Sequence, residues 1–190
     1  MDKIEIKLVA SESESKALDE LLWEVLWRPV GLPHTIRRSF KIEGESVELV
    51  AIVNSKVVGG LVANWRSPVE VELRHLAVKP EVQGKTMGSK LVEKLISIVS
   101  QRNCSTVQTI SRNTSAGFFR KLGFVPQPGK APEHPVFKKH GITFEIFEFK
   151  CKHIESVNTA DKKNSFAACQ SADSRDSQQI TEELKGGAPL

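Results

Sequence analysis

The sequence has no tyrosine among its 190 residues, and aromatic residues of any kind make up only 6% of it. Its apolar stretches are far shorter than the roughly 18–20 residues that a membrane-spanning helix needs. The first residues, MDKIEIKLVASESES, lack the basic and then apolar run of a secretory signal. We therefore expect a cytoplasmic protein with no membrane partner.

Cysteine is scarce as well. Cys104, Cys151 and Cys169 are odd in number, and they show neither a C-x-x-C pair nor the Cys and His spacing of a metal site. His134 and His140 also lack companions that would complete a set of metal ligands. We predict no structural disulfide and no bound metal, with Cys104 as a small core residue.

Charge of neither sign dominates. The net charge is +4 with 26% charged residues. Dedicated nucleic-acid-binding domains instead concentrate Lys and Arg on one face, with aromatic residues between them. A small anionic ligand suits this balance at least as well, so we expect no nucleic-acid partner.

The C-terminal segment has few large apolar side chains. Residues 156–190 are rich in Ser, Asp, Gln, Ala and Lys. Such a segment cannot bury enough apolar surface to offset the entropy of ordering it. We predict one folded domain over residues 1–155 and a disordered polar tail over 156–190, and the sequence leaves monomer and homodimer open.

What the sequence does contain is an alternation of strand and helix patterns. Ser11 and Glu14 form the S-x-x-E of a capping box, which predicts a helix start, and Asn54-Ser55 separates two apolar runs as a hairpin turn would. In chain order, the pattern predicts a strand (3–9), a helix (12–26), three strands (46–53, 56–65 and 69–78), a helix (84–101), a strand (105–111), a helix (115–122) and a strand (143–150). This order predicts an α/β fold with a mixed sheet and helices packed on it.

The third strand of the meander carries a shift in its apolar pattern. Val71 and Leu73 place the apolar face on odd positions, whereas Leu76 and Val78 place it on even ones. One extra residue between Leu73 and Leu76, a β-bulge, would keep one face buried and bend the strand. The alternative is a strand that is buried on both faces beyond Arg74.

The turn after this strand contains Gly84-Lys85-Thr86, which looks like the end of an ATP-binding phosphate loop. That loop requires G-x-x-x-x-G-K-[ST], and Lys79 stands at the position of its first glycine. The start of the next helix still offers free N–H groups and a dipole that favour negative charge. We therefore predict a phosphate-binding turn of another layout.

Two motifs carry a resemblance to a known family. LRHLAVKPEVQGKTMG resembles the fourth-strand signature and the [QR]-x-x-G-x-[GA] turn of the GNAT superfamily of acyl-CoA-dependent N-acyltransferases. Gln83 and Gly88 match, but Thr86 stands where the family usually has glycine. RNTSAGFFRKLGF is similar to a second family motif, in which Phe119 stands at the usual tyrosine. The matching residues of this second motif are Asn113, Ala116, Lys121, Gly123 and Phe124.

The resemblance covers residues 3–150 and implies a GNAT fold, a twisted, mostly antiparallel sheet splayed between strands 4 and 5 with helices on both faces. It also implies acetyl-CoA as co-substrate and an amine as acceptor. The pantetheine arm would pair with backbone groups of Leu76, Ala77 and Val78, and Asn113 and Phe119 would lie at the cofactor. The pyrophosphate would bind amides of Gln83, Gly84, Lys85, Thr86, Met87, Gly88 and Ser89.

Thr86 is a departure from the family motif. If its φ is positive, a β-branched side chain strains the backbone by about 1–3 kcal/mol. If its backbone is helical, its hydroxyl can bond a phosphate oxygen. We predict the helical geometry.

Glu72 is the predicted general base, acting through water, because several members of the superfamily place a catalytic glutamate at this position. A general base is needed because a protonated amine must lose its proton before it attacks a thioester. The alternative for Glu72 is a strand carboxylate paired with Arg66 or Arg74. His75 is the second candidate for the base, against a structural histidine at the bulge. A backbone N–H near Leu76 would stabilise the developing oxyanion.

The proton for the leaving thiolate has no obvious donor, because the chain has no tyrosine. Three explanations stay open. The thiolate leaves without an acid, a residue such as Ser115 donates the proton, or the protein binds acyl-CoA without efficient turnover. The sequence thus predicts an acetyl-CoA-dependent N-acetyltransferase. A non-catalytic acyl-CoA sensor or partner-binding module on the same fold is the alternative.

Overall fold

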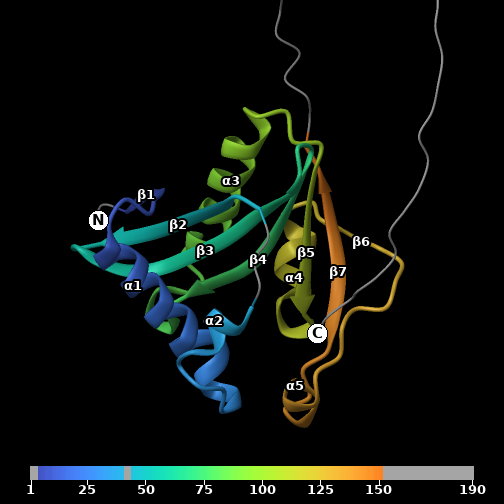
Figure 1. Cartoon of the computed structure of the whole chain (residues 1–190), viewed down its shortest axis with the longest axis horizontal. Coiled ribbons are helices and arrows are strands. Elements are labelled where there is room, and N and C mark those ends of the chain that lie inside the picture. Colours follow the sequence, from blue (N-terminus) through green and yellow to red (C-terminus); the bar gives the residue numbers. More distant parts are fainter. Residues whose placement is uncertain (1–3, 41–43, 152–190) are drawn as a thin grey trace, which may run out of the picture. The chain divides into compact units, whose positions relative to one another are not determined.

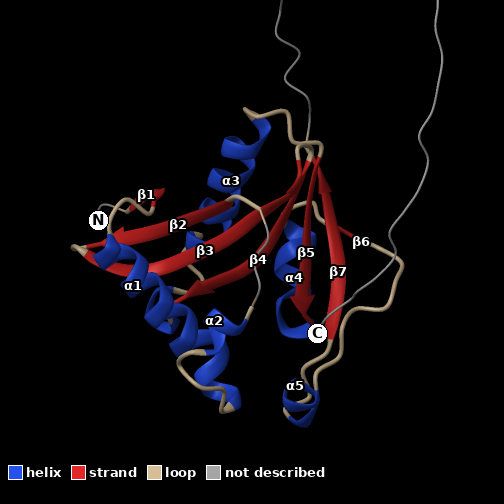
Figure 2. Ribbon diagram, viewed as in Figure 1, coloured by secondary structure: helices blue, strands red, loops and turns tan. Residues whose placement is uncertain are grey.

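The protein is described by a computed structural model over residues 4–40 and 44–151. These residues form one seven-stranded mixed sheet with helices on both faces (Figure 1). The strand order is β1-β2-β3-β4-β5-β7-β6, and only β4 and β5 are parallel (Figure 2). The predicted mixed, mostly antiparallel sheet is confirmed. The predicted tail at 156–190, its boundary and Cys169 lie outside the described residues.

The strands are β1 (Glu5–Leu8), β2 (Ser46–Val53), β3 (Lys56–Ser67), β4 (Glu70–Val78), β5 (Thr106–Arg112), β6 (Val125–Pro126) and β7 (Phe144–Lys150). The helices are α1 (Glu12–Leu22), α2 (Ile36–Ser39), α3 (Met87–Ser100), α4 (Ala116–Lys121) and α5 (Pro135–Lys139). Every predicted element is present. The short α2, α5 and β6 lie in segments that the sequence pattern left as loops. No helix among the described residues is long and apolar enough to cross a membrane.

Local signals explain the start of α1 and the β2–β3 turn. The Ser11 side chain accepts a hydrogen bond from the Glu14 N–H at 3.2 Å, which confirms the predicted N-cap. Asn54 and Ser55 have φ values of 48° and 62°, the positive values that a two-residue hairpin of matching twist requires. The predicted hairpin is therefore confirmed as well.

Two apolar clusters bury the two faces of the sheet. Leu18 and Leu22 of α1 pack on one face with Val50 and Val62, and α1 lies in front of β2 and β3 in Figure 1. The cluster on the other face is larger and joins α3 and α4 to the sheet through Leu91, Leu95, Ala116, Phe119 and residues of β2 to β5 and β7. The sheet thus has helices packed on both faces.

The predicted β-bulge is present. Val62 pairs with His75 and Ala63 pairs with Leu73, so Arg74 is the extra residue of β4. Leu73 and Leu76 consequently pack toward the same apolar cluster. The apolar pattern of β4 shifts by one position because the bulge inserts one residue.

The parallel pairing of β4 with β5 ends at the bulge. Its last pair is Leu73 with Thr109, although β4 continues to Val78 and β5 to Arg112. The Thr109 hydroxyl donates a hydrogen bond to the Leu73 carbonyl at 2.8 Å, and Thr109 is buried. This bond satisfies the carbonyl at the point where the strands part. The predicted splay between strands 4 and 5 is confirmed.

We expect Thr109→Val to lower the free energy of unfolding by about 1–3 kcal/mol, because the buried Leu73 carbonyl loses its donor. Urea unfolding measures the change. Thr109→Ser is the matched control, since it keeps the hydroxyl, and it should lose clearly less. Equal stability of Thr109→Val and the wild type would contradict this role.

Candidate functional site

Two cavities meet where β4 leaves β5. One, of about 450 Å³, lies between the end of β4, the following turn, the start of α3 and residues 114–118. The other, of about 250 Å³, lies between the bulge, the end of β5, the segment after α1 and the region of α5. Leu76 and Ser115 line both. The bulge therefore sits at the junction of two chambers.

The larger cavity contains most of the predicted cofactor-binding residues. Leu76, Val78, Gln83, Gly84, Thr86, Met87, Gly88 and Ser89 line it. Lys85 lies in the same turn with an exposed side chain, whereas the buried Ala77 belongs to the cluster beneath α1. The structure thus brings the β4 edge and the phosphate-type turn to one chamber.

The start of α3 is suited to an anion. The first hydrogen bond of this helix runs from Lys90 N–H to the Thr86 carbonyl, so the N–H groups of Met87, Gly88 and Ser89 precede the intrahelical ladder. These groups and the helix dipole favour a negatively charged ligand. A Cβ on Gly88 would stand 3.3 Å from the Phe118 ring, so the glycine keeps this approach open. The turn therefore suits a negatively charged group, as the predicted phosphate-binding turn requires.

Gln83 fixes the turn to the strand. Its side-chain Nε2 donates to the Val78 carbonyl at 2.8 Å, while the Gln83 N–H donates to the Pro80 carbonyl. The Gln83 side chain thus connects the turn to the end of β4. This contact fixes the backbone between β4 and the start of α3.

Thr86 does not have the predicted helical geometry. Its φ is 60° and its ψ is 4°, in the left-handed region, and its hydroxyl donates to the Lys85 carbonyl at 2.6 Å. The chain needs positive φ here because it enters α3 through a tight turn that also uses Gly84, at φ 75°. The family's glycine position thus keeps its backbone requirement, and the β-branched side chain is strained by about 1–3 kcal/mol.

We expect Thr86→Gly to raise the melting temperature by about 2–4 °C. Relief of the strain exceeds the roughly 0.5–1 kcal/mol that glycine loses through its freer unfolded chain, which leaves a gain near 1 kcal/mol. The control is Thr35→Gly, because Thr35 has an ordinary φ of −80°, and this variant should melt lower than the wild type. Thermal unfolding followed by circular dichroism measures both, and a fall for Thr86→Gly would contradict the strain.

The smaller cavity contains both predicted catalytic residues. Glu72 and His75 share one face of β4, and the Glu72 carboxylate lies 2.7 Å from Arg66 Nη1 and 3.4 Å from Arg74 Nη1. These ion pairs match the alternative reading of Glu72 as a paired strand carboxylate. Its place in the cavity wall is what the base would also require, so the base assignment stays a prediction.

His75 lies beside Trp27, edge to face with ring centroids 5.1 Å apart, and beside Phe40. Its Nε2 is buried and has no hydrogen-bond partner among the described residues. Burial, and then the positive charges of Arg74, Arg37 and Arg112, lower the pKa of His75 to about 3. The imidazole is therefore neutral near pH 7.

Asn113 and Phe119 are placed differently from the other predicted residues. The Asn113 side chain contacts the loop before β7, donating to the Gly141 carbonyl at 3.3 Å and accepting from Thr143 N–H at 3.4 Å. Among the residues described, it lines neither cavity. Phe119 packs in the core against Phe124 and touches the smaller cavity. Their roles at the cofactor stay predictions.

Phe118, which the sequence suggests as a core or an acceptor-cleft residue, was not predicted to line the larger cavity. Phe118 borders the larger cavity, next to Gly88, whereas its neighbour Phe119 faces the core. A signal was available, because Phe118 follows Ser115 by three residues and the two share a helical face.

Cys104 is buried, and its burial raises the pKa of its thiol to about 11, in keeping with an inert core residue.

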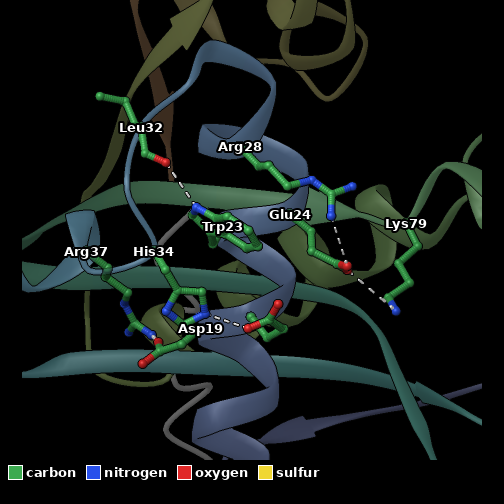
Figure 3. Close-up of polar contacts among 9 residues, drawn as sticks. Asp19, Trp23, Glu24, Arg28, Leu32, His34, Arg37 and Lys79 are labelled. Carbon is green, nitrogen blue, oxygen red and sulfur yellow. Dashed lines mark hydrogen bonds and ion pairs between the residues drawn. The ribbon is translucent and has the colours of Figure 1, made fainter.

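The segment between α1 and α2 forms the outer wall of the smaller cavity. Trp23–Trp27 is π-helical, a geometry that often marks functional sites, and Leu26 and Trp27 border the cavity. Figure 3 shows how the segment is fastened, with Trp23 Nε1 donating to the Leu32 carbonyl at 3.0 Å. Glu24 lies 3.7 Å from Arg28 and 3.8 Å from Lys79. The last contact ties the wall to the end of β4.

Comparison with known proteins agrees with this architecture. Residues 45–126, which contain β2 to β6, match the family described as "Acetyltransferase (GNAT) domain". In sequence over this segment and in fold, the chain is similar to the GNAT acetyltransferases. It is similar to an "Uncharacterized N-acetyltransferase ycf52" of Pyropia yezoensis, with 27% identity over 134 residues, 67% of this chain and 76% of that protein.

Solved structures share the GNAT fold. The ribosomal-protein-S18-alanine N-acetyltransferase of Escherichia coli aligns with a TM-score of 0.66 and 18% identity over 84% of this chain and all of that one. The PaiA N-acetyltransferase of Thermoplasma acidophilum, solved in complex with coenzyme A, aligns with a TM-score of 0.61 and 19% identity over 78% of this chain and 99% of that one. The resemblance inferred from the two motifs together with the order of the elements is confirmed.

Proposed function

We propose that this GNAT domain transfers an acetyl group from acetyl-CoA to a primary amine by direct attack, without a covalent enzyme intermediate. The observation that carries the proposal is the junction of the two cavities at Leu76 and Ser115, beside the bulge. One chamber suits a phosphorylated thioester and the other an acceptor. The GNAT neighbours solved with coenzyme A support the assignment of the first chamber.

The chain's own groups would hold the substrate at both ends. Beyond Leu73 the β5-facing edge of β4 has no strand partner among the described residues, so its backbone can pair with an extended pantetheine arm. The α3 N-terminus takes the pyrophosphate. A backbone N–H near Leu76 would then donate to the thioester carbonyl oxygen, where negative charge develops during attack.

Two proton movements remain for side chains at the junction. Glu72 is proposed to take the ammonium proton through water. Ser115 is the hydroxyl residue that lines both cavities, and it is proposed as the donor to the leaving thiolate. A thiol has an ordinary pKa of about 8.5, so a thiolate is also a fair leaving group without an acid.

A non-catalytic acyl-CoA sensor is the second candidate function. It is favoured by the absence of tyrosine from the chain and by Phe119, which occupies the usual tyrosine position with a buried, apolar side chain. A sensor would bind acetyl-CoA as the enzyme does. It would release no CoA when amines are added.

The first test is a calorimetric titration of the protein with acetyl-CoA, with ATP as the control ligand. Saturable binding of acetyl-CoA alone supports the proposal, and tighter binding of ATP would revive the nucleotide-loop reading. Release of CoA that depends on an added amine then separates the enzyme from the sensor. Binding without release across a broad panel of amines and peptides would overturn the enzymatic assignment.

A further inference from the structure

One guanidinium in the wall of the smaller cavity has no carboxylate partner among the described residues. Arg112, the last residue of β5, borders the cavity and is partly buried. Its Nη2 donates to the Leu26 carbonyl at 2.6 Å, and its Cζ lies 5.1 Å from the centroid of the Phe137 ring. Burial lowers the pKa of this guanidinium. The guanidinium is thus positioned at the cavity by a carbonyl and a ring. Neither of them cancels its charge.

The other arginine side chains that the structure describes each have a carboxylate partner. Arg37 contacts Asp19 and Glu48, and Arg66 and Arg74 contact Glu72. The remaining pairs are Arg28 with Glu24, Arg102 with Glu45 and Arg120 with Glu145. Within the described part of the chain, Arg112 is therefore the arginine whose charge is left for a ligand.

Arg112 also lies at the height of the cavity junction. Leu73 and Thr109 are the last parallel pair, so Leu76 and Arg112 stand three residues further along their two strands. The splay separates the strands there, and both residues border the smaller cavity. An anion bound to Arg112 and an amine placed at Leu76 would therefore occupy the same cavity.

The surroundings distinguish the two ends of this cavity. Arg74, Arg37 and Arg112 lie near His75, and Arg112 is the one of the three without a carboxylate partner among the described residues. The His75 Nε2 also has no partner among these residues. Glu72 lies farther down β4 beyond the bulge. The apolar side chains that line the cavity include Leu26, Trp27, Phe40, Pro132, Phe137 and Phe144. A polycationic acceptor would therefore meet like charge beside the junction.

We propose that the acceptor is a free amino acid with an apolar side chain, whose carboxylate binds Arg112. Its amine lies at the Leu76–Ser115 junction and its side chain lies among Trp27, Phe40 and Phe137. The cavity of about 250 Å³ is below the roughly 300–1,000 Å³ of most small-molecule sites, which suits a single residue. This substrate class rests on the proposed acetyl transfer.

The test uses products of that reaction as probes. With CoA at saturation, calorimetry compares N-acetyl-L-phenylalanine with its neutral amide, and N-acetyl-L-leucine with its amide. Each acid is expected to bind at least tenfold more tightly than its amide, because only the acid forms the charge-assisted bond to Arg112. Equal binding of acid and amide, or no binding of either acid, would overturn the inference.

Arg112→Gln should weaken binding of the acid at least tenfold and leave the amide within twofold. Arg120→Gln is the matched control, since Arg120 also lies 5.1 Å from a ring, that of Phe147, but pairs with Glu145 away from the cavity. Its acid and amide affinities should not change. If Arg112→Gln fails to fold, Arg112→Lys keeps the charge, and it should retain a preference for the acid that is smaller than in the wild type.

The inference and the proposed function fail in different ways. If acetyl-CoA binds but the acid and the amide bind equally, the amino-acid acceptor is ruled out and the proposal of acetyl transfer stands. If the acid is preferred but CoA does not bind, the anion site is supported and the transferase function is ruled out.

Discussion

Lowering the pH from 6.5 to 4 is expected to remove about 3 kcal/mol of the free energy of unfolding through His75 alone. The unfolded chain binds a proton at this residue below its ordinary pKa of about 6.5, whereas burial among three arginines lowers the pKa of His75 in the fold to about 3. Between these two values only the unfolded state takes up the proton. Stability is therefore full above pH 6.5 and falls as the pH drops toward 3.

Urea unfolding at pH 7.5, 6, 5 and 4 measures this effect in the wild type and in His75→Phe. The variant replaces the imidazole with a ring that suits Trp27 and Phe40 and cannot be protonated. It should be less sensitive to acid by about 1.4 kcal/mol per pH unit between pH 6 and 4. His140→Gln, at an exposed histidine after α5, is the control. Identical pH profiles for the wild type and His75→Phe would contradict the burial of a neutral imidazole.

The same environment bears on catalysis. A base whose conjugate acid has a pKa of about 3 takes a proton from an ammonium group poorly near neutral pH. The geometry therefore favours His75 as a structural residue at the bulge, and Glu72 stays the better proposal for the base. The buried Nε2 of His75 has no hydrogen-bond partner among the described residues. It can therefore form a hydrogen bond with an amine substrate in the cavity.

The sheet was predictable from the sequence wherever burial imposes a period. The apolar pattern of β4 shifts by one position, and the structure accommodates the shift by making Arg74 the extra residue. Pairing with β5 stops at that bulge, so one local irregularity predicted both the splay and the place of the site. The Asn54-Ser55 hairpin followed from turn chemistry in the same way.

The site was less predictable where tertiary contacts decide a residue's role. Thr86 stands at a family glycine position, but its β-branched side chain argued against a positive φ, and the turn geometry overrides that preference. Asn113 matched a motif, yet its amide bonds to the loop before β7. Arg112 stood in a strand pattern with nothing to mark it, since its meaning depends on which carboxylates the fold leaves out of reach.

Glu72→Gln is expected to slow amine-dependent release of CoA at least tenfold. The amide keeps the size of the side chain in the cavity wall and cannot take the ammonium proton. The loss should be largest at the low-pH side of the rate profile, where most of the amine is protonated. Unchanged binding of acetyl-CoA would show that the defect lies on the acceptor side.

The two ion pairs of Glu72 require a control, because Glu72→Gln also releases Arg66 and Arg74. Arg66→Gln breaks the 2.7 Å pair at an exposed guanidinium and leaves the carboxylate in place. Exposed pairs contribute about 0–1 kcal/mol, which corresponds to at most about fivefold, so this variant should lose less rate than Glu72→Gln. A loss in Arg66→Gln that equals the loss in Glu72→Gln would assign Glu72 to positioning. A tenfold difference between the two variants would leave proton transfer as the reason the carboxylate is needed.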